Sequence, residues 1–182
     1  MGTGGYPATV ENPSSGHETP GQDDDVEAVT ALLGREPRCG FRVVVRDASG
    51  GPVVIENEPL LHDGTPMPTR YWLVGAAARS AVGRIESEGG VRRAEREVDP
   101  GELTRAHQLY SEQRDRLLPP DHHGPRPTGG VGGTRTGVKC LHAHYAWYLA
   151  GGPDPVGRWV ADQLSRPTRE SGGGPLRSAG EG

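Results

Sequence analysis

The densest group of residues able to do chemistry lies in one short segment, 139–144, which contains Cys140, His142 and His144. Two kinds of chemistry suit these residues: metal binding through sulfur and imidazole nitrogen, or nucleophilic attack by a thiol that a neighbouring histidine activates. The surrounding residues are apolar, which predicts a buried helix over 138–150. On such a helix Cys140 and His144 share a face, whereas His142 points away from both.

Neither kind of chemistry is required by this segment. Structural zinc sites typically contain cysteine pairs about two to four residues apart, and this chain has only Cys39 and Cys140. We therefore expect no bound metal and no cofactor. The alternative role for Cys140 is that of a buried side chain that packs like a small hydrophobic residue, with the histidines hydrogen-bonded inside the protein.

A second group forms a polar stripe on a predicted helix over 99–118. His107, Tyr110 and Arg114 are three and four residues apart and therefore share one helix face. On that face Arg114 would bind the carboxylate or phosphate of a small anionic ligand through two parallel hydrogen bonds. The alternative is that Arg114 pairs with an acidic side chain of the protein, such as Asp63.

Two further features match functional motifs only in part. His122 and His123 are adjacent in a segment without periodicity, and two such histidines do not by themselves make a metal site. Residues 129–134 are glycine-rich, but they lack the lysine and the preceding strand of a phosphate-binding loop. We expect neither feature to bind a ligand.

The hydrophobic periodicity predicts a single α+β domain over 24–165, with a small, mainly antiparallel three-stranded sheet packed by four to five helices. Strands are predicted at 41–46, 52–56 and 70–74, and helices at 24–33, 76–88, 99–118, 138–150 and 155–164. A rigid loop with two prolines over 63–69 precedes the third strand. A long Gly/Pro-rich loop over 119–137 is expected to be either mobile or functional.

The composition limits how much of the chain folds. Of 182 residues, 29 are Gly and 17 are Pro, and only 32% are hydrophobic, well below the roughly 45–50% of an average globular domain. Residues 1–23 and 166–182 carry almost no large apolar side chains, so both tails are expected to be disordered. The N-terminal tail is also acidic, with no basic residue.

Charge and hydropathy argue against several classes of protein. The net charge is −4, and residues 26–164 carry as many basic as acidic side chains, which argues against nucleic acid as a partner. No apolar run approaches the roughly 18 residues of a membrane span, so no membrane partner is expected. The N-terminus lacks the features of a signal sequence, and we expect a cytoplasmic protein with reduced thiols.

Four motifs resemble, in the same order, the bacterial family called domain of unknown function 501, which is typical of actinobacteria. They are LGREPR at 33–38, DGTPMPTRYWL at 63–73, AHQLY at 106–110 followed by Arg114, and VKCLH at 138–142. The resemblance extends from about Val26 to Leu164. Its most specific parts are the Asp-Gly-Thr-Pro loop and the Val-Lys-Cys-Leu-His segment.

The resemblance implies a small cytoplasmic protein but no activity, because the function of the family is unknown. Its genes often lie near those of enolase, a septum-formation initiator and an exopolyphosphatase, which hints at division or polyphosphate metabolism. Many members have Cys-x-Cys-Gly in the hairpin and a cysteine after the third strand. This chain has Asp47-Ala48-Ser49-Gly50 and Gly75 there, so it lacks the cysteines for such a metal site.

Two functions from different classes follow from these observations. The first is a non-enzymatic module that interacts with a protein partner. The alternative is an enzyme or a binder of a small anionic ligand, with a pocket around His107, Arg114, Cys140 and the loop from Asp63 to Thr69. The candidate pocket residues are Asp63, Thr65, His107, Tyr110, Arg114, Cys140 and His142. The pocket hypothesis requires that these side chains face one cavity.

Overall fold

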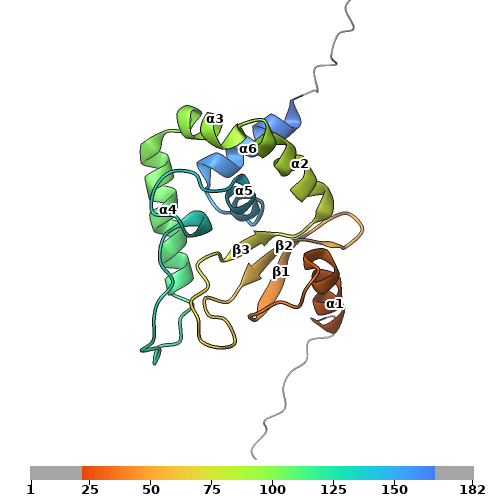
Figure 1. The fold of residues 1–182 in the computed structure, drawn as a ribbon, viewed down its shortest axis with the longest axis vertical. Helices are drawn as coiled ribbons and strands as arrows, with labels where there is room; N and C mark the ends of the chain where they lie inside the picture. Colours follow the sequence, from red (N-terminus) through yellow and green to blue (C-terminus); the bar gives the residue numbers. More distant parts are fainter. Residues whose placement is uncertain (1–21, 167–182) are drawn as a thin grey trace, which may run out of the picture.

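The computed structural model describes residues 22–166 of the chain. Within them, helices pack on both faces of a small sheet (Figure 1). The elements are α1 (Gln22–Leu33), β1 (Phe41–Arg46), β2 (Pro52–Asn57), β3 (Tyr71–Leu73), α2 (Ala76–Ser87), α3 (Gly90–Glu97), α4 (Pro100–Asp115), the short 3₁₀ helix η1 (Val131–Gly133), α5 (Leu141–Leu149) and α6 (Pro155–Ser165). The predicted α+β class is therefore confirmed. Residues 1–21 and 167–182, which make up nearly all of the two predicted tails, lie outside the described residues.

The sheet is built around β2, which pairs antiparallel with β1 on one side and β3 on the other. The turn between β1 and β2 is closed by Asp47, whose side chain accepts hydrogen bonds from the backbone N–H groups of Ser49 and Gly51, both at 2.9 Å. In this chain hydrogen bonds therefore close the turn.

Both faces of the sheet are covered, because successive residues of a strand point to opposite sides. Ile55 of β2 packs with Val29 of α1 and with Val74 in a small core on one face. Val54 belongs to the larger core on the other face, where Leu141 and Trp147 of α5 are almost fully buried. Figure 1 shows α1 alone on its side of the sheet and the other helices grouped on the opposite side.

Two helical features differ from the sequence-based predictions. The α3 helix was not predicted, and it brings the α-helices of the described residues to six. Helix α5 begins at Leu141 rather than at 138, because the backbone before it is extended: Cys140 is the N-cap residue with φ −159° and ψ 124°. None of the helices within 22–166 is long and apolar enough to cross a membrane.

Two loops contact α4. The proline loop covers residues 63–69, and the glycine-rich loop covers residues 119–137 and includes η1. The glycine-rich loop lies close against α4, since a Cβ added at Gly130 would be 2.5 Å from the Cβ of His107. Only glycine allows so close an approach of the backbone.

Candidate functional site

The polar stripe on α4 is buried and holds both loops. Arg114 is 1% exposed and donates through Nη1 to the carbonyl oxygens of Gly129 at 2.8 Å and Pro68 at 3.3 Å, and through Nη2 to that of Pro127 at 3.1 Å. Its Nε donates to the carboxylate of Asp115 at 2.8 Å. All three nitrogens of the guanidinium therefore bind the protein itself, and Arg114 joins the proline loop to the glycine-rich loop.

His107 binds the glycine-rich loop, and Tyr110 binds the residue that follows the proline loop. His107 Nδ1 accepts a hydrogen bond from the N–H of Val131 at 3.0 Å, and its Nε2 donates to the carbonyl of Gly137 at 3.0 Å. Burial lowers the pKa of His107, which keeps the ring neutral. The Tyr110 hydroxyl accepts the N–H of Arg70 at 2.6 Å, and burial raises the pKa of this phenol.

The two candidate residues of the proline loop lie at its exposed turn. Asp63 accepts a hydrogen bond from the N–H of Thr65 at 2.9 Å, and its carboxylate lies 3.9 Å from the guanidinium of Arg38. The hydrogen bonds from Thr65 and the charge of Arg38 lower the pKa of Asp63. Asp63 is therefore not the partner of Arg114, the alternative that the sequence left open.

Cys140 and His142, the last two candidates, line a cavity of about 500 Å³ at the start of α5. We call it the α5 pocket. Its walls come from the end of α1, from Thr69 at the end of the proline loop, from β3, from α2, from η1 and from the residues around the start of α5. The lining residues are Leu33, Thr69, Tyr71, Trp72, Leu73, Arg79, Gly132, Lys139, Cys140, His142 and Ala143. Of the seven candidate residues, the structure places only Cys140 and His142 here.

Three chemically active side chains meet beside this pocket. Cys140 Sγ lies 3.8 Å from His142 Nδ1, which in turn lies 3.2 Å from Oε1 of Glu86 on α2. His142 Nε2 is 3.1 Å from the carbonyl oxygen of Arg79. The hydrogen bond with Cys140 and the negative charge of Glu86 raise the pKa of His142 to about 9.

The prediction that Cys140 shares a face with His144 is wrong, because Cys140 precedes the helix instead of lying in it. His144 is fully buried, and its Nδ1 lies 2.8 Å from the carboxylate of Asp154. Asp154 also accepts the N–H of Gly157 at 2.8 Å and so caps α6. His144 therefore joins α5 to α6 inside the core, away from Cys140.

The α5 pocket has two cationic residues. Arg79 and Lys139 are both exposed at its wall, and neither takes part in a salt bridge within residues 22–166. Arg79 donates one hydrogen bond, from Nη1 to the carbonyl of Leu32 at 3.1 Å. Its remaining donors and the ammonium of Lys139 have no partner among the hydrogen bonds of the described residues.

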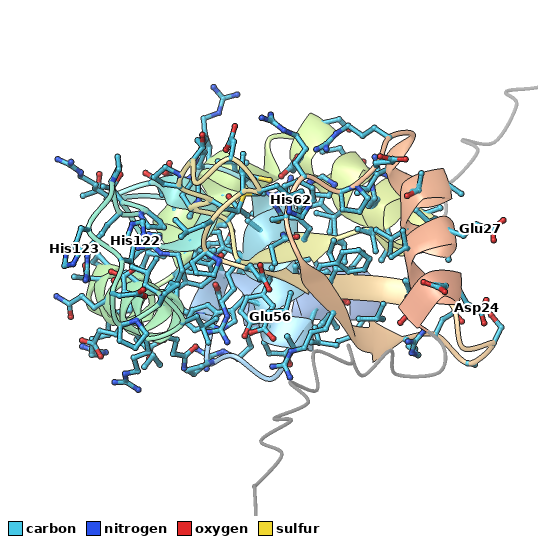
Figure 2. All side chains as sticks on the ribbon, turned by 90° about the horizontal axis from the view of Figure 1, so that it is seen from below. Asp24, Glu27, Glu56, His62, His122 and His123 are labelled. Atoms are coloured by element: carbon cyan, nitrogen blue, oxygen red, sulfur yellow. The ribbon has the colours of Figure 1, made fainter. Side chains whose placement is uncertain are left out.

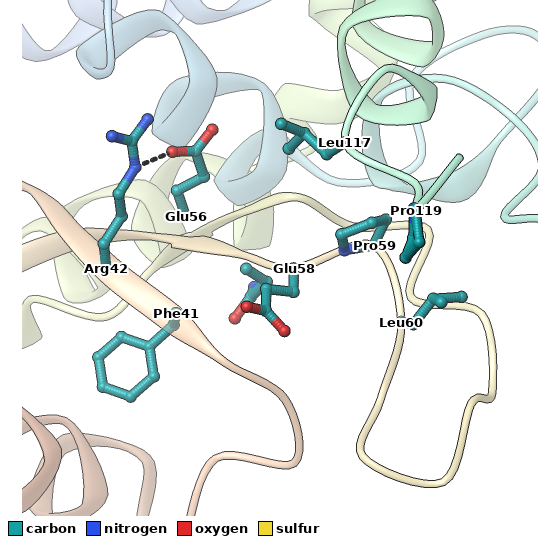
Figure 3. Close-up of a pocket in the computed structure, with 9 residues that line it drawn as sticks. Phe41, Arg42, Glu56, Glu58, Pro59, Leu60, Leu117 and Pro119 are labelled. Carbon is teal, nitrogen blue, oxygen red and sulfur yellow. Dashed lines mark hydrogen bonds and ion pairs between the residues drawn. The ribbon is translucent and has the colours of Figure 1, made fainter. Parts of the chain in front are cut away.

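A second cavity of about 570 Å³, the hairpin groove, lies between β1, the end of β2 and the residues that follow α4 (Figure 3). Its lining residues are Phe41, Arg42, Glu56, Asn57, Glu58, Pro59, Leu60, Leu117 and Pro119. Most of the wall is apolar, and Leu117 is 47% exposed. The buried carboxylate of Glu56 is paired with Arg42, as the dashed line in Figure 3 shows, and with Arg70.

The adjacent histidines of the glycine-rich loop lie apart from both cavities. Figure 2 shows His122 and His123 together at one end of the molecule, far from Asp24 and Glu27 on α1 at the other end. His122 Nε2 is 3.0 Å from the carbonyl of Pro125 in the same loop. The neighbours of His122 in this contact are therefore residues of its own loop.

Sequence reasoning missed Glu86, Arg79 and Trp72 as site residues. Glu86 is 54 positions before Cys140, and no spacing rule relates a carboxylate on one helix to a thiol at the start of another. The amphipathic helix over 76–88 was predicted, but polar side chains of such a helix are expected to face solvent, so the pattern did not single out Glu86.

The comparisons with known proteins agree with the motifs noted in the sequence. No curated protein and no solved structure gives a significant match to this chain. A family model described as a protein of unknown function, DUF501, matches residues 43–162. The matched residues include β2, β3 and every helix that forms the α5 pocket except α1. Because the match covers more than half of the 182 residues, the chain belongs to the DUF501 family.

Proposed function

We propose that this protein binds a small anionic ligand in the α5 pocket. The observation that supports this function most is the pair of cations on the pocket wall, Arg79 and Lys139, which form no ion pair within the described residues. Two positive charges beside a concave, partly apolar wall attract a negative group. The ligand class is that of the alternative function raised from the sequence, but here Arg79 and Lys139 take the role that was assigned to Arg114.

The rest of the pocket narrows the chemistry of the ligand. A volume of about 500 Å³ lies within the roughly 300–1,000 Å³ of small-molecule sites. Leu33, Trp72 and Leu73 supply apolar and aromatic wall, and the first turn of α5 adds partial positive charge through its N–H groups. These features favour a carboxylate or phosphate group attached to an apolar or planar body.

Calorimetric titration of the full chain with phenyl phosphate tests this proposal. We expect phenyl phosphate to bind more tightly than inorganic phosphate, because only the former has a planar body for the apolar wall. Lys139→Met and Arg79→Met are each expected to weaken binding at least about tenfold, which corresponds to about 1.4 kcal/mol. Arg92→Met on α3 is the matched control, since Arg92 is exposed and outside the pocket.

Thermal unfolding gives an independent measurement. A ligand at about 100 times its dissociation constant stabilises the folded state by about 2.7 kcal/mol, which raises the melting temperature by several degrees in a domain of this size. The proposal fails if neither phenyl phosphate nor an aromatic carboxylate shifts the melting temperature at millimolar concentration. It also fails if Arg92→Met weakens binding as much as Lys139→Met does.

The hairpin groove supports a second candidate, the interaction module predicted from sequence. Phe41, Leu60 and Leu117 give the groove an apolar wall beside the carboxylate of Glu58, which suits a partner segment with apolar side chains and a basic residue. Without its partner the purified chain is expected to self-associate through this surface. Sedimentation at rising concentration measures this, and Leu117→Glu is expected to abolish it; a monomer at every concentration contradicts the module.

We also propose that the protein works in the cytoplasm. Cys39 and Cys140 are both free thiols in the fold, and a reducing compartment keeps an accessible thiol such as Cys140 in that form. Treatment of intact cells with a thiol-reactive, membrane-impermeant label tests this. We expect Cys140 to stay unlabelled, and labelling of Cys140 would place the protein outside the cytoplasm.

A further inference from the structure

The strongest cluster of metal-ligating atoms in the described residues joins two helices beside the α5 pocket. Glu86 of α2, Cys140 and His142 each offer one ligand atom, and these atoms all lie within 4.8 Å of one another. The sulfur and the imidazole nitrogen are 3.8 Å apart, and the nitrogen is 3.2 Å from the carboxylate oxygen. All three side chains are partly buried, so their approach is set by the packing of the helices.

Two of these separations are close to those between the ligands of a zinc ion. Sulfur, nitrogen and oxygen ligands lie about 2.0–2.3 Å from zinc, and in a tetrahedral arrangement they therefore lie about 3.3–3.6 Å from one another. The observed nitrogen–oxygen separation of 3.2 Å is close to this range, and the sulfur–nitrogen separation of 3.8 Å is a few tenths longer. Because no two of the three ligand atoms are more than 4.8 Å apart, rotations of the Cys140 and Glu86 side chains would bring them to a common ion.

The hydrogen bonds around the cluster orient its ligand atoms. The carbonyl of Arg79, 3.1 Å from His142 Nε2, can only accept a hydrogen bond, so Nε2 carries a proton and Nδ1 faces Cys140 and Glu86. Metal-bound histidines usually have such a partner on the second nitrogen. The N–H of Leu141 donates to Glu86 Oε1 at 2.6 Å and fixes the carboxylate.

We propose that Glu86, Cys140 and His142 bind one divalent transition-metal ion of the zinc class. A thiolate, an imidazole and a carboxylate form a ligand set for zinc rather than for magnesium or calcium, which take oxygen ligands. The thiolate and carboxylate would neutralise the charge of the ion. Three protein ligands leave a fourth position, as in catalytic zinc sites.

The open position lies beside the α5 pocket, because Cys140 and His142 are both part of its wall. An anionic group held by Lys139 or Arg79 would be able to occupy that position, and this last step alone rests on the proposed function. The expectation of no metal rested on the absence of paired cysteines. It did not consider a carboxylate supplied by α2.

Metal content and cobalt spectroscopy of the full chain, freed of any affinity tag, test the proposal. We expect one zinc ion per chain after incubation with zinc and gel filtration. Cobalt is expected to give the charge-transfer absorption of a thiolate–metal bond and the visible bands of a tetrahedral site. Cys140→Ser should remove the charge-transfer absorption, and Glu86→Gln should weaken zinc binding by more than the roughly 10–100-fold typical of second-shell changes.

Matched controls separate this site from other thiols and histidines. Cys39→Ser is expected to bind zinc as the wild type does, because Cys39 is buried beside Asn57 and burial raises the pKa of its thiol. His122→Gln should also leave the affinity unchanged. In the wild type, zinc is expected to protect Cys140 from alkylation by iodoacetamide, a measurement that does not depend on the folding of any variant.

The outcomes are distinct for the two proposals that share the pocket. Lys139→Met is expected to weaken phenyl phosphate binding and leave zinc binding unchanged, whereas Glu86→Gln is expected to weaken zinc binding. The metal proposal is overturned if the wild type retains no stoichiometric zinc, if cobalt gives no thiolate band, or if zinc leaves the alkylation rate of Cys140 unchanged. None of these results depends on whether an anion binds.

Discussion

Replacing Arg114 by alanine tests how the two loops are attached to α4. The guanidinium is 1% exposed and donates to three backbone carbonyls, those of Pro68, Pro127 and Gly129, at 2.8–3.3 Å. A hydrogen bond from a charged donor contributes about 1.5–3 kcal/mol. Because water can reach carbonyls of surface loops after the truncation, we expect a net loss of about 3–5 kcal/mol in the free energy of unfolding.

Thermal and urea denaturation measure this loss. At about 3 °C per kcal/mol for a domain of this size, Arg114→Ala should lower the melting temperature by about 9–15 °C. Arg114→Lys keeps the charge but has only one nitrogen donor, so an intermediate loss is expected. The matched control is Arg116→Ala two residues later, whose side chain is 73% exposed and lies 3.6 Å from Glu112; it should cost less than about 0.5 kcal/mol.

The reasoning is refuted if Arg114→Ala melts within about 3 °C of the wild type while Arg116→Ala does the same. In that case the three carbonyls would not need Arg114, and the guanidinium would be available for a ligand. Arg114 would then return to the role that the sequence suggested for it, the binding of a small anion. A large loss of stability instead assigns the polar stripe of α4 to the fold.

Two further predictions concern charge and packing. Burial alone would raise the pKa of Glu56, but the hydrogen bond and charge of Arg42 and the charge of Arg70 lower it. The ion pairs of Glu56 therefore stabilise the fold fully above the unfolded pKa of about 4.3. This stabilisation is lost as the pH falls through the lower pKa of the folded state. Glu56→Gln should therefore reduce the loss of stability below about pH 5 in urea titrations, and parallel curves for variant and wild type would contradict this. Gly157→Ala places a Cβ 2.3 Å from a side-chain atom of α5 and should destabilise the fold by at least about 1–3 kcal/mol. Gly83→Ala, with nothing within 4 Å, should stabilise it by about 0.5–1 kcal/mol; effects of the same sign on the melting temperature would refute the packing argument.

The parts of the fold predictable from sequence are those in which apolar periodicity reports a buried face. The run Val53-Val54-Ile55 predicted a strand, and β2 is indeed the central strand, with Val54 and Ile55 in different cores. A strand covered on both faces has no polar side to alternate with, so its sequence is continuously apolar. The same reasoning predicted α2 and α6 to within a few residues.

Elements that depend on contacts with distant side chains were not predictable. The eight residues of α3 include only Val91 and Ala94 as larger apolar contacts, which is too few for a visible period. The start of α5 is decided by Glu95 and Glu86, which accept the N–H groups of Val138 and Leu141 at 2.8 and 2.6 Å. These bonds keep the backbone extended up to Cys140, whereas the apolar pattern alone continues the helix back to 138.

The same two contacts explain why the candidate site was only half visible in the sequence. If α5 began at 138, Cys140 and His142 would point in different directions, as the helical spacing requires. Because Glu86 accepts the N–H of Leu141, Cys140 becomes the N-cap residue and its sulfur approaches His142. Glu86 therefore has two roles: it sets the boundary of α5, and its carboxylate completes the group of three ligand atoms. The side chain that creates the geometry of the site is also part of the site, which is why periodicity within a single helix did not reveal it.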